Sequence, residues 1–422
     1  MDALTWRSSE QAPRRTGTVG AVLTTRRALA VTVAALALFA GACSSSDGGS
    51  DATKDTKAPG ASTTTTVAEG AADPAYAELG PNPVGSRTIA LDDGRRVVIW
   101  YPAAASAADT PPEIFDIASL LSPELQGKID ADLRPKYEID AHIGADPATD
   151  GPYPVVLFSH GYAGFPEQSA DLVTHLASWG FVVIAPDHVE RSLSGLLGTA
   201  SQGVEKREDP DVLSASLDAA IADAEADVSP LHDLMDLDEV AVTGHSAGAS
   251  AAYLTASSDD RVKAFISYSV GTGRPDESGK VAERPVPDVP GMVMLGTADG
   301  IIEPERSVEV YDGMQPPKYL VEIEGAGHLV FSDICLIGKD QGGLVQLTKE
   351  AGLDLPDDLL RLASDGCEPD KTDPADAFAA IDHFSVAFLR YELGIDAEPV
   401  GLDQATADSF DPPQITFTSE TD

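Results

Sequence analysis

The chain has 422 residues and a formal net charge of −41, because 69 acidic residues outnumber 28 basic ones. A field of that sign disfavours nucleic acid and anionic lipid surfaces as partners. The sequence contains three cysteines, no CxxC pair and no HExxH motif, so we expect no structural zinc site.

The N-terminal residues have the pattern of an export signal. Two arginines precede an uncharged run over 28–42, which ends in small residues directly before Cys43. This pattern predicts a secretory signal over 1–42, because the run is shorter than the ~20 apolar residues that span a bilayer. The paired arginines are compatible with both Sec and twin-arginine export.

The cysteine after the predicted signal is placed as in a bacterial lipobox. Ala40 stands where leucine is usual, but the small residues before Cys43 favour a lipid on this cysteine. We therefore expect an extracytoplasmic lipoprotein that contacts the membrane only through its N-terminal lipid. The alternative is ordinary secretion with a free Cys43.

Composition divides the rest of the chain into three parts. Residues 43–80 comprise the cysteine and a stretch of mostly Ser, Thr, Gly, Ala and Asp. Such a stretch cannot bury enough apolar surface to offset its ordering entropy, so it predicts a disordered tether. Residues 81–396 are long enough for one domain with a sizeable core. Residues 397–422 are predicted to be a polar, loosely ordered tail.

Apolar strands and amphipathic helices alternate along 81–396, as in an open α/β sheet. In chain order we expect a hairpin over 87–101, strands at 154–159, 181–185, 240–243, 264–269, 291–295 and 319–323, and helices at 168–179, 211–227, 249–254, 303–311 and 377–393. The pattern predicts a mostly parallel, twisted sheet with helices on both faces. The intervening loops 103–150, 272–289 and 329–375 are expected to shape a pocket.

The sequence Gly-His-Ser-Ala-Gly at 244–248 lies between the expected strand 240–243 and a helix of small residues. A G-x-S-x-G motif in this context places Ser246 on a strained turn with its Oγ exposed. The glycines allow the strand and helix to approach closely. The alternative is a glycine-rich turn around an inert serine.

Two residues further along the chain have the positions of a base and an acid. His328 follows the last expected strand, 319–323, and Asp299 follows the strand before it. A carboxylate at that position can hold the tautomer of an imidazole that removes the serine proton. The alternatives are a surface histidine and a turn aspartate, with Glu303 and Asp333 as the other candidate acids.

Two backbone N–H groups are candidates for an oxyanion hole. One belongs to Ala247, directly after the serine, and the other to Tyr162 in the loop 160–164 after the strand 154–159. The alternative for this loop is a plain glycine turn.

The remaining histidines receive other roles. His160 and His245 flank the site and are expected to orient loops rather than transfer protons. His188 and Arg191 either line the pocket or form a local ion pair. His383, on the final expected helix, is assigned to the core or the surface.

Two cysteines remain if Cys43 is lipidated. Cysteines in an exported protein usually pair, so Cys335 and Cys367 are expected to form a disulfide. It would close a loop of about 32 residues and contribute ~3 kcal/mol in the chain-entropy model. The alternative is two separate buried thiols.

With these residues the chain resembles the α/β-hydrolase superfamily. Within it, the chain is similar to the plasma-type platelet-activating-factor acetylhydrolase family and to dienelactone-hydrolase-like and cutinase-like bacterial esterases. Four stretches carry the resemblance: 98–102, 153–161, 176–183 and 244–248. Ala249 departs from relatives with a second glycine there, but alanine is the better helix former. The resemblance implies hydrolysis of ester bonds without metal or cofactor, often of short or oxidised acyl groups.

The leading functional hypothesis is an exported, membrane-tethered serine carboxylester hydrolase acting on a small-molecule, lipid or polyester ester. The same three residues could instead transfer an acyl group to a cell-envelope alcohol. A third hypothesis, from a different class, is a non-catalytic binding lipoprotein on a hydrolase scaffold.

Overall fold

The computed structural model describes residues 72–226, 229–273 and 284–421. These residues all fall in one structural unit, Thr66–Asp422. The predicted signal, Cys43 and the predicted tether up to residue 71 lie outside the described residues. Among the helices described, none is both long and apolar enough to cross a membrane.

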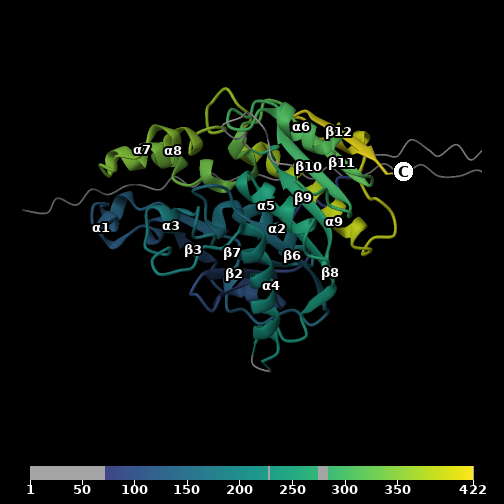
Figure 1. Cartoon of the computed structure of the whole chain (residues 1–422), viewed down its shortest axis with the longest axis horizontal. Coiled ribbons are helices and arrows are strands. Elements are labelled where there is room, and N and C mark those ends of the chain that lie inside the picture. Colours follow the sequence, from purple (N-terminus) through teal and green to yellow (C-terminus); the bar gives the residue numbers. More distant parts are fainter. Residues whose placement is uncertain (1–71, 227–228, 274–283, 422) are drawn as a thin grey trace, which may run out of the picture. The chain divides into compact units, whose positions relative to one another are not determined.

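A ten-stranded sheet runs through the described residues (Figure 1). Its strands are, in spatial order, β12 (Ile415–Glu420), β11 (Lys318–Ile323), β10 (Gly291–Gly296), β9 (Val262–Tyr268), β8 (Met235–His245), β6 (Tyr153–Ser159), β7 (Val182–Pro186), β2 (Arg96–Pro102), β1 (Val84–Ala90) and β5 (His142–Ile143). Neighbours from β7 to β11 all pair in parallel. The pairs β11–β12, β2–β7 and β1–β2 are antiparallel. The predicted, mostly parallel sheet is therefore confirmed.

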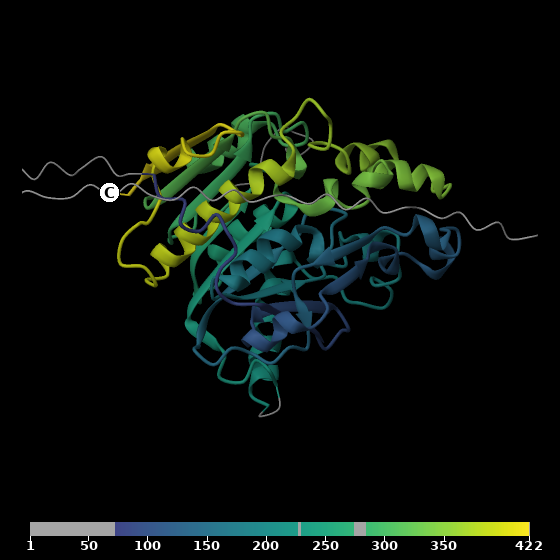
Figure 2. The same ribbon diagram turned by 180° about the vertical axis from the view of Figure 1, so that it is seen from behind.

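The two faces of the sheet are covered by different helices, as the sequence pattern predicted. All seven residues of the central strand β6 are buried, as expected for a parallel strand covered on both faces. Val155 and Leu157 belong to one hydrophobic core, whereas Val156 and Phe158 belong to the other. The first core includes α4 (Asp209–Ala224), α5 (Ala247–Ala256) and α6 (Pro304–Asp312), and the second includes α2 (Ala170–Ser178) and α9 (Pro374–Glu392). Figure 2 shows α9 in yellow across the second face.

Two of the loops outside the sheet carry short elements of their own. The first, 103–150, contains β3 (Glu113–Asp116), β4 (Lys136–Ile139), α1 (Pro123–Gln126) and the 3-10 turns η1 (Ala105–Asp109), η2 (Ile117–Leu120) and η3 (Ala131–Leu133). The second, 329–375, contains α7 (Gly343–Glu350), α8 (Asp357–Leu362) and the 3-10 turns η5 (His328–Phe331), η6 (Asp333–Cys335) and η7 (Lys339–Gln341). Both views place α7 and α8 beside α1 and α3 (Leu193–Leu196) (Figures 1 and 2).

A disulfide joins the two ends of most of the second loop. Cys335 and Cys367 are bonded, with their Cα atoms 5.2 Å apart. The cysteines are therefore not the separate buried thiols that the sequence left as the alternative.

The C-terminal segment is part of the domain, and the expectation of a loosely ordered tail over 397–422 is wrong. Strand β12 pairs along the whole of β11. Ile415 and Phe417 point into the core, and the ring of Phe417 stacks on that of Phe384 in α9 at 5.3 Å between centroids. Two apolar residues spaced by two are sufficient for an edge strand, although the segment around them is polar.

The last nine residues of the predicted tether also pack on the domain. Tyr76 is buried, with its ring edge-on to Trp179 and stacked on His383. His383 is itself buried in α9, so its place is the core rather than the surface. The folded part of the chain therefore begins before the boundary at residue 81.

Candidate active site

The turn that carries Ser246 is one residue long. Strand β8 ends just before Ser246 and α5 begins just after it. Its backbone angles are φ 60° and ψ −117°, a combination that non-glycine residues adopt rarely and at a cost in strain. A Cβ on Gly244 would collide with the backbone of Gly248, and a Cβ on Gly248 with that of Ser159. Both glycines of the motif are therefore required by close backbone contacts.

A chain of hydrogen bonds leads from this serine through an imidazole to a carboxylate. His328 Nε2 lies 2.9 Å from Ser246 Oγ, and His328 Nδ1 lies 2.8 Å from Asp299 Oδ2. The other carboxylate oxygen accepts the N–H groups of Ile301 and Ile302, both at 2.8 Å. Burial alone would raise the pKa of Asp299, but these hydrogen bonds and the nearby imidazole hold it below the usual value.

The two N–H groups predicted for an oxyanion hole lie beside the serine in sequence or line its cavity. Ala247 is the first residue of α5, so its N–H has no acceptor within the helix. Within the described part of the chain, the N–H of Tyr162 donates to no protein acceptor. Tyr162, Ser246 and His328 line one cavity.

A buried arginine, Arg191, anchors the loop that presents Tyr162. The guanidinium of Arg191 donates to the carbonyls of His160 and Gly161 and to Ser159 Oγ. Its own carbonyl accepts the N–H of Ala163 at 2.7 Å. Three of these bonds fix the backbone on both sides of Tyr162, and the fourth holds the side chain of Ser159.

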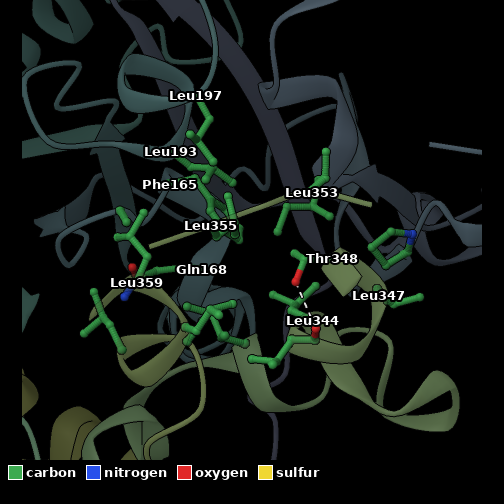
Figure 3. A pocket seen from close by; sticks show the side chains of 18 of the residues that line it. Phe165, Gln168, Leu193, Leu197, Leu344, Leu347, Thr348, Leu353, Leu355 and Leu359 are labelled. Carbon is green, nitrogen blue, oxygen red and sulfur yellow. Dashed lines mark hydrogen bonds between the residues drawn. The ribbon is translucent and has the colours of Figure 1, made fainter. Parts of the chain in front are cut away.

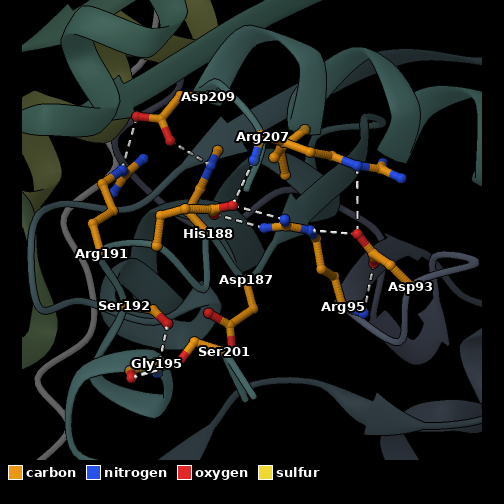
Figure 4. Close-up of polar contacts among 12 residues, drawn as sticks. Asp93, Arg95, Asp187, His188, Arg191, Ser192, Gly195, Ser201, Arg207 and Asp209 are labelled. Atoms are coloured by element: carbon orange, nitrogen blue, oxygen red, sulfur yellow. Dashed lines mark hydrogen bonds and ion pairs between the residues drawn. The ribbon is translucent and has the colours of Figure 1, made fainter. Parts of the chain in front are cut away.

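The charge of this arginine is balanced beneath the loop. Arg191 Nε lies 2.9 Å from Asp209 Oδ2, and His188 Nδ1 lies 3.0 Å from Asp209 Oδ1 (Figure 4). Burial would raise the pKa of Asp209, but the contacts with His188 and Arg191 hold it far below the usual value. Neither His188 nor Arg191 lines the cavity. Of the two roles left open by the sequence, they have the local ion pair.

A second hydrogen-bond network connects this loop to the backbone of His328. His245 Nε2 lies 2.9 Å from the carbonyl oxygen of His328. Gln168 lies 3.1 Å from the other nitrogen of His245 and accepts the N–H of Gly161. Burial and the neighbouring His328 lower the pKa of His245 to about 3, so this imidazole is neutral. It donates to the His328 carbonyl and accepts from the Gln168 amide.

Asp365 is a site residue that the sequence did not indicate. Its Oδ1 accepts the N–H of His328 at 2.8 Å and that of Gly300 at 3.2 Å. One carboxylate from the loop 329–375 therefore bridges the backbones that carry the imidazole and Asp299. A Cβ on Gly300 would collide with this carboxylate. No sequence pattern marks Asp365, because its partners lie on loops that only the fold brings together.

The two other candidate acids do not face the imidazole. Glu303 is exposed at the start of α6. Asp333 is buried, and accepts the hydroxyl of Tyr137 and the N–H of Asp171. Burial, with the nearby charge of Asp171, raises the pKa of Asp333 to about 7. Asp382, fully buried near Asp171, has a pKa raised well above the usual value by burial and that same carboxylate.

A family model described as Chlorophyllase matches residues 127–273. The matched segment contains Tyr162 and Ser246, and ends before Asp299 and His328.

Similar proteins are found among curated sequences. The chain is 29% identical over 151 residues to platelet-activating factor acetylhydrolase of Bos taurus, covering 27% of this chain and 34% of that protein. It is 26% identical over 277 residues to chlorophyllase-2 of Arabidopsis thaliana, covering 54% and 81%. It is 25% identical over 314 residues to platelet-activating factor acetylhydrolase of Canis lupus familiaris, covering 65% and 68%. The chain thus spans about a third of the bovine protein's length and more of the other two.

A solved structure of ferulic acid esterase from Streptomyces cinnamoneus aligns with a TM-score of 0.50 and 20% identity. It covers 80% of this chain and 97% of that one. Its likeness supports the fold, which is that of the α/β-hydrolases. The family match, the relatives and this structure together confirm the resemblance to α/β-hydrolase-type esterases that the sequence indicated.

Folding stability should fall as the pH rises through the range set by Asp333. Its raised pKa means that the folded chain keeps a proton that the unfolded chain loses near pH 4. The free energy of unfolding should therefore decrease between about pH 4 and pH 7, by at most about 1.4 kcal/mol per pH unit for this group.

Urea denaturation of the wild type and Asp333→Asn across this range measures the effect, and the variant should show the shallower fall. Asp340→Asn, an exposed position on η7, should behave as the wild type does. Equal slopes for the wild type and Asp333→Asn would contradict the assignment.

Proposed function

We propose that this protein is a serine carboxylester hydrolase that works through an acyl-enzyme. The observation that carries the proposal is the continuous hydrogen-bonded chain from Ser246 Oγ through His328 to Asp299, with the serine on the strained turn. This is the arrangement that activates a serine hydroxyl for attack on an acyl carbon. The similarity to esterases supports the same reaction class.

In the proposed reaction each group has a role. His328 Nε2 takes the proton of Ser246 Oγ as the oxygen attacks the ester carbonyl, while Asp299 holds Nδ1–H and stabilises the imidazolium. The N–H groups of Ala247 and Tyr162 stabilise the oxyanion that forms. His328 then returns the proton to the departing alcohol, and water attacks the acyl-enzyme with the same imidazole as base.

We also propose that the enzyme acts outside the cytoplasm, tethered by a lipid on Cys43. Support comes from the signal pattern over 1–42 and from the cysteine that follows it. The bond between Cys335 and Cys367 adds support, because disulfides persist in oxidising compartments.

Replacing the serine should abolish ester hydrolysis. Ser246→Ala should lower the kcat of p-nitrophenyl acetate hydrolysis at least about 10³-fold, because no other group can take its place as nucleophile. Ser250→Ala, one turn along the same helix, should retain activity. A fluorophosphonate probe should label the wild type and not Ser246→Ala.

A wild-type kcat in Ser246→Ala would contradict the proposal. Failure of the wild type to label would favour a non-catalytic binding protein. An added alcohol acceptor, with analysis of the products, separates hydrolysis from acyl transfer.

Asp365 should act as a positioning residue for the imidazole. Asp365→Ala leaves two backbone N–H groups without their acceptor, at about 1–3 kcal/mol each. We expect kcat to fall by about 10- to 100-fold with little change in KM. Asp365→Asn keeps an acceptor oxygen and should retain most of kcat. Steady-state kinetics on variants with native circular dichroism tests this, and equal kcat for both variants would speak against positioning.

The tether can be tested by changing the cysteine. Cys43→Ser removes the thiol that would carry the lipid, so the protein should move from the membrane fraction to the medium. Ser44→Ala, the adjacent position, should stay with the membranes. Immunoblots of fractionated cells measure this. An unchanged distribution for Cys43→Ser would rule out lipidation at this cysteine.

A further inference from the structure

The cavity at Ser246 is lined by aliphatic side chains from two separate parts of the chain (Figure 3). One wall comes from the loop 103–150 and α3, and includes Ile117, Leu121, Leu193 and Leu197. The other comes from α7, α8 and the residues between them, and includes Leu344, Leu347, Leu353, Leu355 and Leu359. We refer to this space, which encloses about 150 Å³, as the leucine-lined cavity.

The described lining of the cavity is apolar apart from the reacting end. Among the described residues that line it, none is Lys, Arg, Asp or Glu. On the wall formed by α7 and α8, the polar side chain is Thr348, and its hydroxyl is satisfied by the carbonyl of Val345 at 2.9 Å. A phosphate or carboxylate placed there would lose its water without gaining a partner. A neutral group is therefore the only kind that the cavity stabilises.

The shape of the lining also argues against a flat aromatic group. The two aromatic side chains of the lining, Tyr162 and Phe165, come from the segment that directly follows β6. Away from the reacting end, where Gly161, Gln168, His245, Ser246 and His328 lie, the walls consist of leucine, isoleucine, valine and alanine with Pro135 and Thr348. These walls offer no aromatic ring for stacking. Flexible methylene chains gain most from contact with such walls.

The second wall is fixed in relation to the reacting groups. The disulfide between Cys335 and Cys367 ties both ends of the segment that carries α7 and α8. Asp365, two residues before the second cysteine, binds the backbone N–H of His328. An aliphatic ligand chain that contacts Leu355 and Leu359 is therefore held at a fixed distance from Ser246.

We propose that the leucine-lined cavity binds the unbranched aliphatic chain of a neutral ester, longer than that of a butyrate, with the ester carbonyl at Ser246. This inference rests on the proposed function and names its substrate class. Each methylene that enters the cavity should raise kcat/KM about three- to fourfold, the factor that corresponds to ~0.8 kcal/mol per buried CH₂. The increase should stop where the cavity ends.

A series of p-nitrophenyl esters from acetate to dodecanoate tests the inference. We expect kcat/KM to rise from acetate through at least the octanoate. A matched ester with a carboxylate at the end of the same chain should react at least tenfold more slowly. If acetate is hydrolysed in a Ser246-dependent manner but kcat/KM is flat or falls beyond the butyrate, the inference is overturned and the proposed function stands.

Binding to a variant that cannot turn over the ester tests the cavity inference independently of the proposed esterase activity. Calorimetric titration of Ser246→Ala with methyl decanoate and with methyl butyrate should give at least tenfold tighter binding of the ester with the longer acyl chain. This outcome supports the inference even if the wild type hydrolyses neither ester, which would count only against the proposed function. Equal affinities would overturn the inference.

Two variants of one wall residue locate the effect. Leu355→Asp places a charge in the cavity, and Leu355→Trp shortens it. Both should lower the ratio of decanoate to acetate kcat/KM at least tenfold, and Leu355→Trp should shift the best substrate to a shorter chain. Leu237→Asp, at a half-exposed leucine of β8 outside the cavity, should leave the ratio unchanged. Unchanged ratios in both Leu355 variants would place the chain elsewhere and overturn the inference.

Discussion

The hydrogen bond between His328 and Asp299 can form only if loops from two different strands are held together. Each loop has a backbone N–H group, that of Gly300 in one and that of His328 in the other, whose acceptor lies outside its own segment. The Asp365 carboxylate supplies the missing acceptor for both. The loop of Tyr162 depends in the same way on Arg191. Charged side chains below the loops therefore determine the geometry of the uncharged groups that face the cavity.

The positions of Ser246, Asp299 and His328 could be predicted because each lies just past a continuous apolar run of the length typical of a buried strand. Parallel strands bring their carboxyl ends to one edge of the sheet, so order along the chain was sufficient. The sheet itself followed from the same alternation of strands and helices. The C-terminal strand β12 could not be predicted in this way, because Ile415 and Phe417 are its only apolar core residues and the segment around them is polar.

The loop-orienting role of His245 was predicted, but its partner Gln168 and the anchoring role of Asp365 could not be, for a different reason. Gln168 and His245 are 77 residues apart, and Asp365 and His328 are 37 apart. A polar residue in a loop has no periodicity, and its partner is specified only by the fold. For His188 and Arg191 the sequence left two roles open, and the deciding fact was burial beneath the Tyr162 loop rather than exposure to the cavity.

Acidic residues occupy two contrasting environments in this chain. Most contribute to the large negative charge of the sequence. Asp333 and Asp382 are instead buried behind the His328 loop, where burial favours their protonated forms. The cavity contains neither kind. The separation keeps a strongly acidic surface compatible with an apolar binding space.

The bond between Cys335 and Cys367 has a consequence for how this protein can change over evolutionary time. It encloses α7 and α8 in a covalently closed cassette whose two ends are fixed beside the His328 loop. Substitutions or insertions between the two cysteines can reshape the wall of the cavity. The two ends of the segment stay in place while this happens, because the disulfide joins them. Substrate preference can therefore diversify among descendants of this chain without disturbing the chemistry at Ser246.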